Sequence, residues 1–381
     1  MPSTQLFPEV IDASTLGAKF SSPLYLPIGV EGWIDVIGAG DAVIGQVYTI
    51  TTPAEAETKF GAASSLSNLV KFILNRGVAP VYAVASKRNS GGDVVAPTLV
   101  QRQAAWQNLE STPSVRIRLT DSELQADHVA LADSAELAEL INHKQFAIVG
   151  MAAATTKAAV LTAASAIASK RGVIVAPGVY DNAGVLMSGN RAATAVACEV
   201  ARNPDPSDDL DTLLIPNLTG IEKDAQGMPI FRRKVVLGVA QNDFEDLLQG
   251  GVSPLMSGRN GGVEISHLRT TWTTDGTFDA LMTRIIADQV FVTVRDYLYN
   301  LNYLREPNNE GTRERMRSGV AALLDGLTDW INKKTQADGT PGFNVQVISS
   351  PDERQVTVSY EGRVVRGIST IQVAANLEIS V

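Results

Sequence analysis

The sequence has few of the residues that carry chemistry in proteins. Its 381 residues include one cysteine, Cys198, so a disulfide within the chain is excluded. The three histidines, His128, His143 and His267, are too widely separated to suggest a metal site. There are 32 Lys and Arg against 41 Asp and Glu, giving a net charge of -9. An acidic chain is poorly suited to sequence-independent binding of nucleic acid, because that binding depends on neutralising phosphates.

Long apolar runs and targeting signals are also missing. No run of about 18 apolar residues occurs, so we expect no membrane-spanning helix. The first nine residues, MPSTQLFPE, have neither the basic nor the apolar region of a signal peptide. Apolar residues make up 45% and charged residues 19%, as in ordinary globular proteins. At about 150 residues per domain, the length suggests two or three domains.

Phosphate-binding and nucleophile motifs are absent too. The triplet at 38–40 (GAG) lacks the third glycine of a dinucleotide-binding loop, and no GxxxxGK[ST] segment occurs. Ser188 lacks the flanking glycines of a nucleophile elbow. We expect His267 to be a strand residue in a β-rich run, and Cys198 to be a small buried residue of a helix. The sequence therefore predicts no catalytic residues, no cofactor, no metal and no enzymatic activity.

Helices and short strands alternate over the first part of the chain. After a strand at 42–51, Thr52 and Pro53 predict the start of a helix that ends at Gly61. Further helices are predicted at 65–75, 99–110, 134–143, 156–170 and 190–202, and further strands at 81–85, 114–119, 145–150 and 173–176. This order is typical of a layered, largely parallel sheet, so we predict an α/β domain over 23–230. The same alternation leaves open an alternative function, an α/β nucleotide-binding protein or enzyme of unknown substrate.

The last third of the chain changes character. A short helix at 243–249 precedes a β-rich run at 263–274. Long helices at 278–303 and 310–334 then lead to β segments at 343–350 and 354–366. Together they predict an α+β domain over 231–368. The second long helix carries a group of basic residues in an acidic chain, Arg313, Arg315, Arg317, Lys333 and Lys334.

The two ends differ from both domains. Residues 1–22 contain several prolines, and their apolar anchors are Leu6, Phe7, Val10 and Ile11, which is typical of an extended arm. Residues 369–381 alternate strictly, with Ile371, Val373, Ala375, Leu377, Ile379 and Val381 on one face. Such a strand is either an inner strand of its own sheet or pairs with a neighbouring molecule. The residues alone leave both readings open.

Two blocks of sequence carry a resemblance to a known family. Residues 49–86 contain a strand, a helix ending in Phe60-Gly61, a small-polar linker, a second helix and a strand with Tyr82. Residues 243–304 contain the segment LLQGGVSPL, the strand VEISHLRTT and a long helix. In order and spacing these blocks resemble the tail sheath proteins of contractile bacteriophages, a family shared with R-type pyocins and related contractile injection systems.

The resemblance implies a fold and an assembly. The fold is an α/β outer domain plus an α+β C-terminal core domain, with an extended N-terminal arm and a C-terminal strand for inter-subunit β-augmentation. The implied protein is a structural subunit that forms stacked hexameric rings around an inner tail tube. Contraction would drive the tube through the host envelope for genome ejection. The implied location is the virion tail, assembled in the bacterial host cytoplasm.

The implied partners are other copies of the chain, the inner tube protein, and the baseplate and tail terminator proteins, with no nucleic acid and no membrane. We expect the tube to contact the basic group of the helix at 310–334, and the loop at 87–95 to be exposed on the outer domain. Another self-assembling virion protein, such as an inner-tube subunit, is the third possibility. The length and the two-domain pattern argue against it.

Overall fold

The computed structural model of the protein describes residues 26–35, 41–89, 95–203, 210–236, 239–258, 261–274, 280–301, 306–327, 343–349 and 356–362. They fall into two compact units. We call the described residues from 26 to 284 the sheet unit and those from 285 to 362 the hairpin unit. The predicted N-terminal arm (1–22), the predicted C-terminal strand (369–381) and residues 90–94 of the predicted loop lie outside the described residues.

The sheet unit is built on one large mixed sheet. Its strands are β1 (Ile28–Asp35), β2 (Val47–Ile50), β3 (Val81–Asn89), β4 (Ile117–Thr120), β5 (Phe146–Gly150), β6 (Gly172–Ala176), β9 (Leu214–Ile215), β13 (Val252–Ser257) and β14 (Val263–Ile265). Within the described residues these nine strands lie in the order β2-β3-β1-β4-β5-β6-β13-β14-β9. Neighbours from β3 to β13 are parallel, whereas β2, β14 and β9 are antiparallel additions at the two edges. The predicted layered α/β fold with a largely parallel sheet is confirmed.

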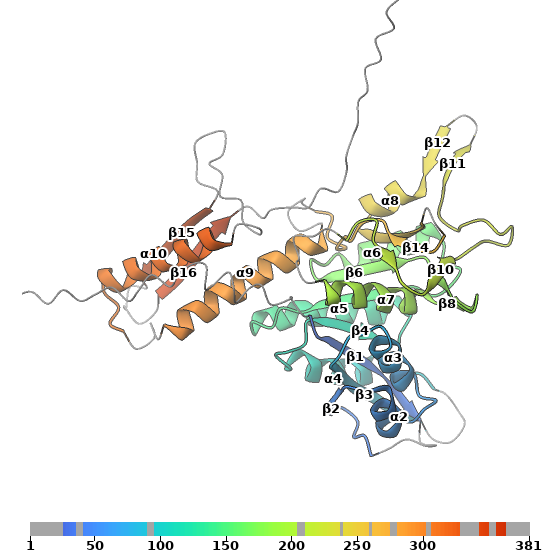
Figure 1. The fold of residues 1–381 in the computed structure, drawn as a ribbon, viewed down its shortest axis with the longest axis horizontal. Helices are drawn as coiled ribbons and strands as arrows, with labels where there is room; N and C mark the ends of the chain where they lie inside the picture. The colour runs from blue at the N-terminus through green and yellow to red at the C-terminus, as the bar shows by residue number, and fades with distance from the viewer. Residues whose placement is uncertain are drawn as a thin grey trace, which may run out of the picture. The chain divides into compact units, whose positions relative to one another are not determined.

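Helices cover both faces of this sheet. They are α2 (Pro53–Phe60), α3 (Ser65–Leu74), α4 (Leu99–Glu110), α5 (Gln125–Leu140), α6 (Lys157–Ile167), α7 (Gly189–Arg202) and α8 (Asp243–Gln249). Helices α3 and α4 lie on opposite sides of β1 and β3 (Figure 1). Every residue of β5 and β6 is buried, which is the pattern of inner parallel strands covered on both faces. On the α4–α6 side, Trp106, Leu131 and Val160 pack against Val149 and Ile174.

Several local predictions are confirmed at the residue level. The Thr52 side chain accepts a hydrogen bond from the Glu55 backbone N–H, Pro53 is the first residue of α2, and Gly61 ends it with φ 86°. Helix α4 spans 99–110 as predicted, and Thr98 and Gln101 close a reciprocal capping box at its start. These boundaries depend on short-range chemistry, which is why the sequence could locate them.

Other predictions need correction. Strand β1, in the middle of the large sheet, was not predicted, and α5 begins at Gln125 rather than at 134. The predicted loop at 87–95 starts too early, because β3 continues through Asn89, which is buried. The β-rich run at 263–274 forms only the short β14, so His267 follows a strand instead of lying in one. In each case tertiary packing extended or cut an element beyond its local pattern.

Two smaller sheets complete this unit. Strands β7 (Val179–Asp181), β8 (Leu186–Met187) and β10 (Leu218–Ile221) form a three-stranded sheet in the order β10-β7-β8. Strands β11 (Arg233–Val236) and β12 (Val239–Asn242) form an antiparallel pair. Because β13 and β14 belong to the large sheet, the last part of the sheet unit extends well beyond residue 230. The domain limits proposed from the sequence stay a prediction.

The hairpin unit contains two helices and two strands. Helix α9 (Leu281–Asn300) begins in the sheet unit and continues into the hairpin unit, where it is followed by α10 (Glu310–Gly326). Strands β15 (Phe343–Ser349) and β16 (Val356–Gly362) lie in the two predicted β segments (Figure 1). They pair antiparallel, with Val347 opposite Val358. Their core consists of Ile286, Val290, Val294, Val320, Leu323, Leu324, Leu327 and Val345. Gly319 sits where an added Cβ would lie 2.1 Å from the Tyr297 hydroxyl oxygen, so this glycine permits close approach of α9 and α10.

Candidate functional site

The β15–β16 hairpin leaves backbone capacity unused within the described part of the chain. The two strands pair with each other through seven residue pairs, and no other described strand joins either of them. Each strand therefore has an outer edge whose alternate N–H and C=O groups can receive a further strand. The sequence places candidate partners at both ends of the chain, but none of those residues lies among the described ones.

The side chains of the hairpin alternate as a half-buried sheet requires. In β15, Val345 is buried whereas Asn344, Gln346 and Ile348 are exposed. On β16, Val358 and Tyr360 pack against the helical core. Burial, and secondarily the nearby Asp288 carboxylate, raises the pKa of the Tyr360 hydroxyl to about 12. One face of the hairpin is thus fixed on α9 and α10, while the other face and both edges remain accessible within the described structure.

The basic residues predicted on α10 are already paired. Arg317 forms two hydrogen bonds with the Glu314 carboxylate, at 2.9 and 2.7 Å. Arg315 pairs with Glu306, and Arg313 donates to the Asn308 side-chain oxygen at 2.8 Å. The charges of Arg315 and Arg317 are therefore partly neutralised within the unit, whereas the hydrogen bonds of Arg313 go to a neutral amide residue. Lys333 and Lys334 lie outside the described residues, and a tube contact through this helix stays a prediction.

Two further sets of predicted residues also lie outside the described residues. They are the strand residues Ile371, Val373, Ala375, Leu377, Ile379 and Val381, and the arm residues Leu6, Phe7, Val10 and Ile11. Their inter-subunit role stays a prediction.

A buried ionic cluster, which the sequence analysis missed, lies at the carboxyl end of β4, beside the middle of β1. Arg102 from α4 holds the Glu31 carboxylate at 2.8 and 2.7 Å and also binds Asp121. Its Nε atom lies 3.1 Å from the Asp127 carboxylate. The side chains of Arg102 and Glu31 are 4% and 0% exposed. Glu31 stands within the otherwise apolar run IGVEGWI, and an acid inside a strand of that kind is the signal that could have revealed it.

The position of this cluster bears on the enzyme alternative. Strands β3 and β4 flank β1 on its two sides, so the order of the sheet reverses between β1 and β4. In open α/β sheets, ligands bind at such a switch point, beyond the carboxyl ends of the strands. Here Arg102 and three carboxylates fill that place and bind one another. The arrangement pairs Arg102 with these carboxylates inside the chain.

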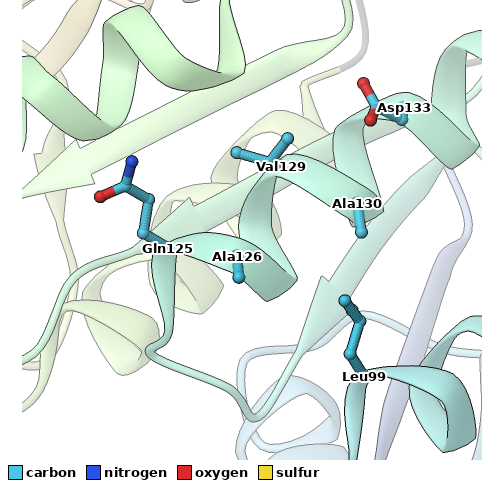
Figure 2. A pocket seen from close by; sticks show the side chains of 6 residues that line it. All are labelled: Leu99, Gln125, Ala126, Val129, Ala130 and Asp133. Atoms are coloured by element: carbon cyan, nitrogen blue, oxygen red, sulfur yellow. The ribbon is translucent and has the colours of Figure 1, made fainter.

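An open depression of about 570 Å³ lies instead on the outer side of α4 and α5 (Figure 2). Its lining consists of Leu99, Gln125, Ala126, Val129, Ala130 and Asp133. Burial and the neighbouring Glu136 raise the pKa of Asp133. A single carboxylate among apolar side chains provides neither a nucleophile with its base nor a phosphate-binding loop.

The remaining candidates for chemistry have structural partners. Cys198 is buried in α7 as predicted, and burial raises the pKa of its thiol to about 12, so it is a poor nucleophile. His128 binds the Ser122 carbonyl oxygen at 2.8 Å, and His267 pairs with Asp211. Within the described residues, no group of three or more His, Cys, Asp or Glu side chains is arranged to hold a metal ion. None of the described helices has the length and apolarity to cross a membrane.

Comparison with known proteins gives a structural likeness and no sequence match. No protein-family model and no curated protein matches the sequence. The helical sheath of the anti-feeding prophage in its contracted state is 12% identical, with 99% of this chain and 100% of that chain covered and a TM-score of 0.64. The sheath tail protein of Listeria innocua is 12% identical, with 92% and 95% covered and a TM-score of 0.65.

A third solved structure agrees with these two. The sheath of an extracellular contractile injection system, PVC, in its contracted state is 14% identical, covers 94% of each chain and has a TM-score of 0.63. The likeness extends over nearly the whole chain in each case. The chain therefore has the fold of tail sheath proteins, and the resemblance read from its two sequence blocks is confirmed at the level of the fold.

Proposed function

We propose that this protein is the structural, non-enzymatic subunit of a contractile sheath. The observation that carries the proposal is the likeness to sheath subunits over 92–99% of the chain, which includes both compact units. A shared fold alone supports many functions. Here it is supported by the internally paired ionic cluster at the switch point and by the hairpin edges that no described strand joins.

The proposed assembly consists of stacked hexameric rings around an inner tube. The arm at 1–22 and the strand at 369–381 would add to the β15–β16 hairpin of neighbouring subunits, a head-to-tail contact that continues from copy to copy. Strands held by backbone hydrogen bonds would keep subunits linked while they change orientation. Contraction would then drive the tube through a target envelope, with the driving free energy supplied by new contacts in the contracted state.

The partners follow from this assembly. We propose the inner tube protein, the baseplate and a tail terminator as partners, with the tube facing the 231–368 domain and the 23–230 domain outermost. In a bacteriophage the device would eject a genome from the virion tail. In a phage-derived injection device the same sheath would serve a tube without a genome.

Negative-stain microscopy of the purified full-length protein tests the proposal. Tubes or rings of regular diameter are expected, whereas discrete small oligomers would contradict it. The double variant Val373→Pro with Leu377→Pro should abolish the tubes, since each proline removes a backbone donor. A matched control, Gln372→Ala with Glu378→Ala, changes the opposite face of the same segment but keeps every backbone donor, and should still form tubes. Tubes from the proline variant would show that another segment links the subunits.

A further inference from the structure

The ionic cluster around Glu31 contains more negative than positive charge. The charged groups that face it from the surrounding elements are Arg102 on α4, Asp121 after β4, Asp127 on α5 and, beside Asp121, Arg191 on α7. Strand β3 and helix α3 contribute the hydroxyls of Ser86 and Ser65. His128 is also close, and burial lowers the pKa of its ring. Three carboxylates thus face two guanidinium groups in a site shielded from water.

The hydrogen bonds at one Glu31 oxygen are fixed by its neighbours. The Thr120 hydroxyl oxygen lies 3.2 Å from Arg102 Nη1 and 3.2 Å from the Ser122 backbone N, and both of these groups are donors. The Thr120 hydrogen is therefore directed to Glu31 Oε2, at 2.7 Å. Arg102 Nη1 lies 2.7 Å from Oε2 and 2.8 Å from Oε1, so the Arg102 contact is common to both oxygens. The Thr120 hydroxyl contacts Oε2 only, and it can only donate there, so Oε2 is the unprotonated oxygen in either charge state.

The second Glu31 oxygen, Oε1, contacts the Ser86 hydroxyl, which can act either as hydrogen-bond donor or as acceptor. The Ser86 hydroxyl contacts Glu31 Oε1 and also lies 3.3 Å from the Gly32 carbonyl oxygen. Ser86 has one hydrogen, so it can donate to only one of these two acceptors. If Glu31 carries a proton on Oε1, Glu31 donates to Ser86 and Ser86 donates to Gly32, and both acceptors are satisfied.

A β-bulge in β3 places the Ser86 side chain at this contact. Along β3 the partner of Gly32 is Ala85 and the partner of Trp33 is Lys87, so Ser86 is the extra residue of a β-bulge. A bulge re-aims the side chain at the irregular position. Here the re-aimed hydroxyl meets the Glu31 carboxyl group.

We propose that Glu31 is a buried proton-binding site, with its proton on Oε1 donated to Ser86, and that the site links the stability of the sheet unit to pH. Burial first, and then the neighbouring Asp121, raise the pKa of Glu31 to about 7, although Arg102 opposes this shift. The Glu31 carboxyl group is therefore protonated in mild acid and ionised in mild alkali. The inference does not depend on the sheath role.

The sign of the pH effect follows from the two states. The ordinary pKa of a glutamate in an unfolded chain is about 4.3. Between about pH 4.3 and about pH 7 the folded sheet unit holds a proton that the unfolded chain releases. The contribution of Glu31 to stability is therefore fully present below about pH 4.3, decreases as the pH rises from there, and is lost once the pH has risen through 7, the approximate folded pKa.

Thermal unfolding of full-length Glu31→Gln against the natural protein tests this inference. The glutamine amide is neutral, like the protonated acid, and can direct an N–H at Ser86, but its nitrogen would replace an oxygen that lies 2.8 Å from the donor Arg102 Nη1. This donor contact adds an offset that is the same at every pH. Relative to the natural protein, the melting temperature of the variant should therefore rise by roughly 5 °C between about pH 5 and about pH 9. Glu123→Gln, a partly exposed acid of the same region, is the control and should show no such divergence. A variant that is less stable by the same amount at every pH would overturn the proposal, since Glu31 would then act as an ionised partner of Arg102.

Infrared difference spectra give a second readout that does not depend on stability. A protonated carboxyl C=O band should be present at about pH 5.5, should fade by about pH 8.5 and should be absent from Glu31→Gln. A band that persists unchanged in the variant would assign the proton to another acid. If neither protein shows a band, Glu31 is ionised throughout and the inference is wrong.

Discussion

The two units use their strands and charges in opposite ways. In the sheet unit, parallel strands lie between helices and charged groups pair in the interior, as with Arg102, whose side chain is 4% exposed. In the hairpin unit, two strands pair only with each other among the described residues. Its ion pair between Arg317 and Glu314 has side chains 54% and 55% exposed. The first unit buries this ion pair between helices and strands, whereas the second exposes its ion pair and has strand edges that no described strand joins.

This difference has an energetic consequence. A two-stranded hairpin is marginally stable by itself and needs further strands or a helical layer. Helices α9 and α10 supply that layer here, through Val290 and Val294 on α9 and Val320 and Leu324 on α10. Strands added by other subunits would stabilise the hairpin unit further by mass action, without a direct effect on the sheet unit. The comparison therefore predicts that assembly and folding can be changed separately.

The largest expected effect is on assembly. Deletion of residues 369–381 should leave a soluble protein that unfolds cooperatively but forms no tubes, as judged by circular dichroism and negative-stain microscopy. If the segment is instead an inner strand of its own sheet, each large apolar side chain loses roughly 1.5–3 kcal/mol of burial. The sum approaches the whole stability of a domain, about 5–15 kcal/mol. Unfolding or aggregation of the deletion variant would therefore contradict the inter-subunit reading.

The next effect should be confined to the sheet unit. Arg102→Met removes the cation from Glu31 and Asp127 and should cost about 3–5 kcal/mol, because buried carboxylates lose their partner. Hydrogen exchange should show lost protection in β1, β4 and α4 and none in β15 or β16. The same change at the exposed Arg317 is the control and should leave the sheet unit unchanged. Equal loss of protection in both units would show that they unfold together.

A destabilising substitution in the hairpin unit should reduce hydrogen-exchange protection there and leave protection in the sheet unit unchanged. Leu324→Ala opens a cavity in a core where Leu324 is fully buried and should cost about 2–5 kcal/mol. Protection should fall in α10, β15 and β16 and remain in β5 and β6. Ile348→Ala, at a side chain 57% exposed on β15, is the control and should change stability by less than about 0.5 kcal/mol.

The smallest effect on folding is expected at the surface of α10. Reversing Arg313 and Arg317 to Glu should weaken co-assembly with the inner tube while the melting temperature stays close to that of the natural protein. Co-sedimentation with preformed tubes measures this, and Arg295→Glu on α9 is the control for a charge reversal in the same unit. Undiminished co-sedimentation of the double variant would remove this face of α10 as the tube contact.

Helix boundaries marked by a capping side chain, and inner parallel strands, could be predicted from the sequence because local chemistry determines them. Helix α5, whose start was predicted too late, has no side-chain cap at Leu124. Thr52, Pro53 and Gly61 define α2 within one turn of the chain. Strands β5 and β6 are continuous apolar runs. By contrast, β1 contains two glycines and a glutamate, and its place in the sheet depends on partners far along the chain.

The ionic cluster could not be derived for a related reason. Glu31, Arg102, Asp121 and Asp127 come from four different elements, and no spacing in the sequence links them. An acid in an apolar strand does predict that some partner exists, but it does not identify which one. The family resemblance, read from two blocks of sequence, predicted the fold better than any single motif did. The proposed linker strand itself stays a prediction.

The bulge at Ser86 also has a consequence for how this fold can vary among distant relatives. Removing that one residue would leave Gly32 opposite Ala85 and Trp33 opposite Lys87, so the strand pairing would survive the deletion. What would disappear is the hydroxyl beside Glu31. We therefore expect a single-residue gap at this point, in a structure-based alignment of sheath-like proteins, to coincide with the replacement of the acid by a neutral residue. Insertions and deletions are usually attributed to surface loops. At this position of β3, a one-residue insertion or deletion would instead accompany the gain or loss of an ionisable group in the interior.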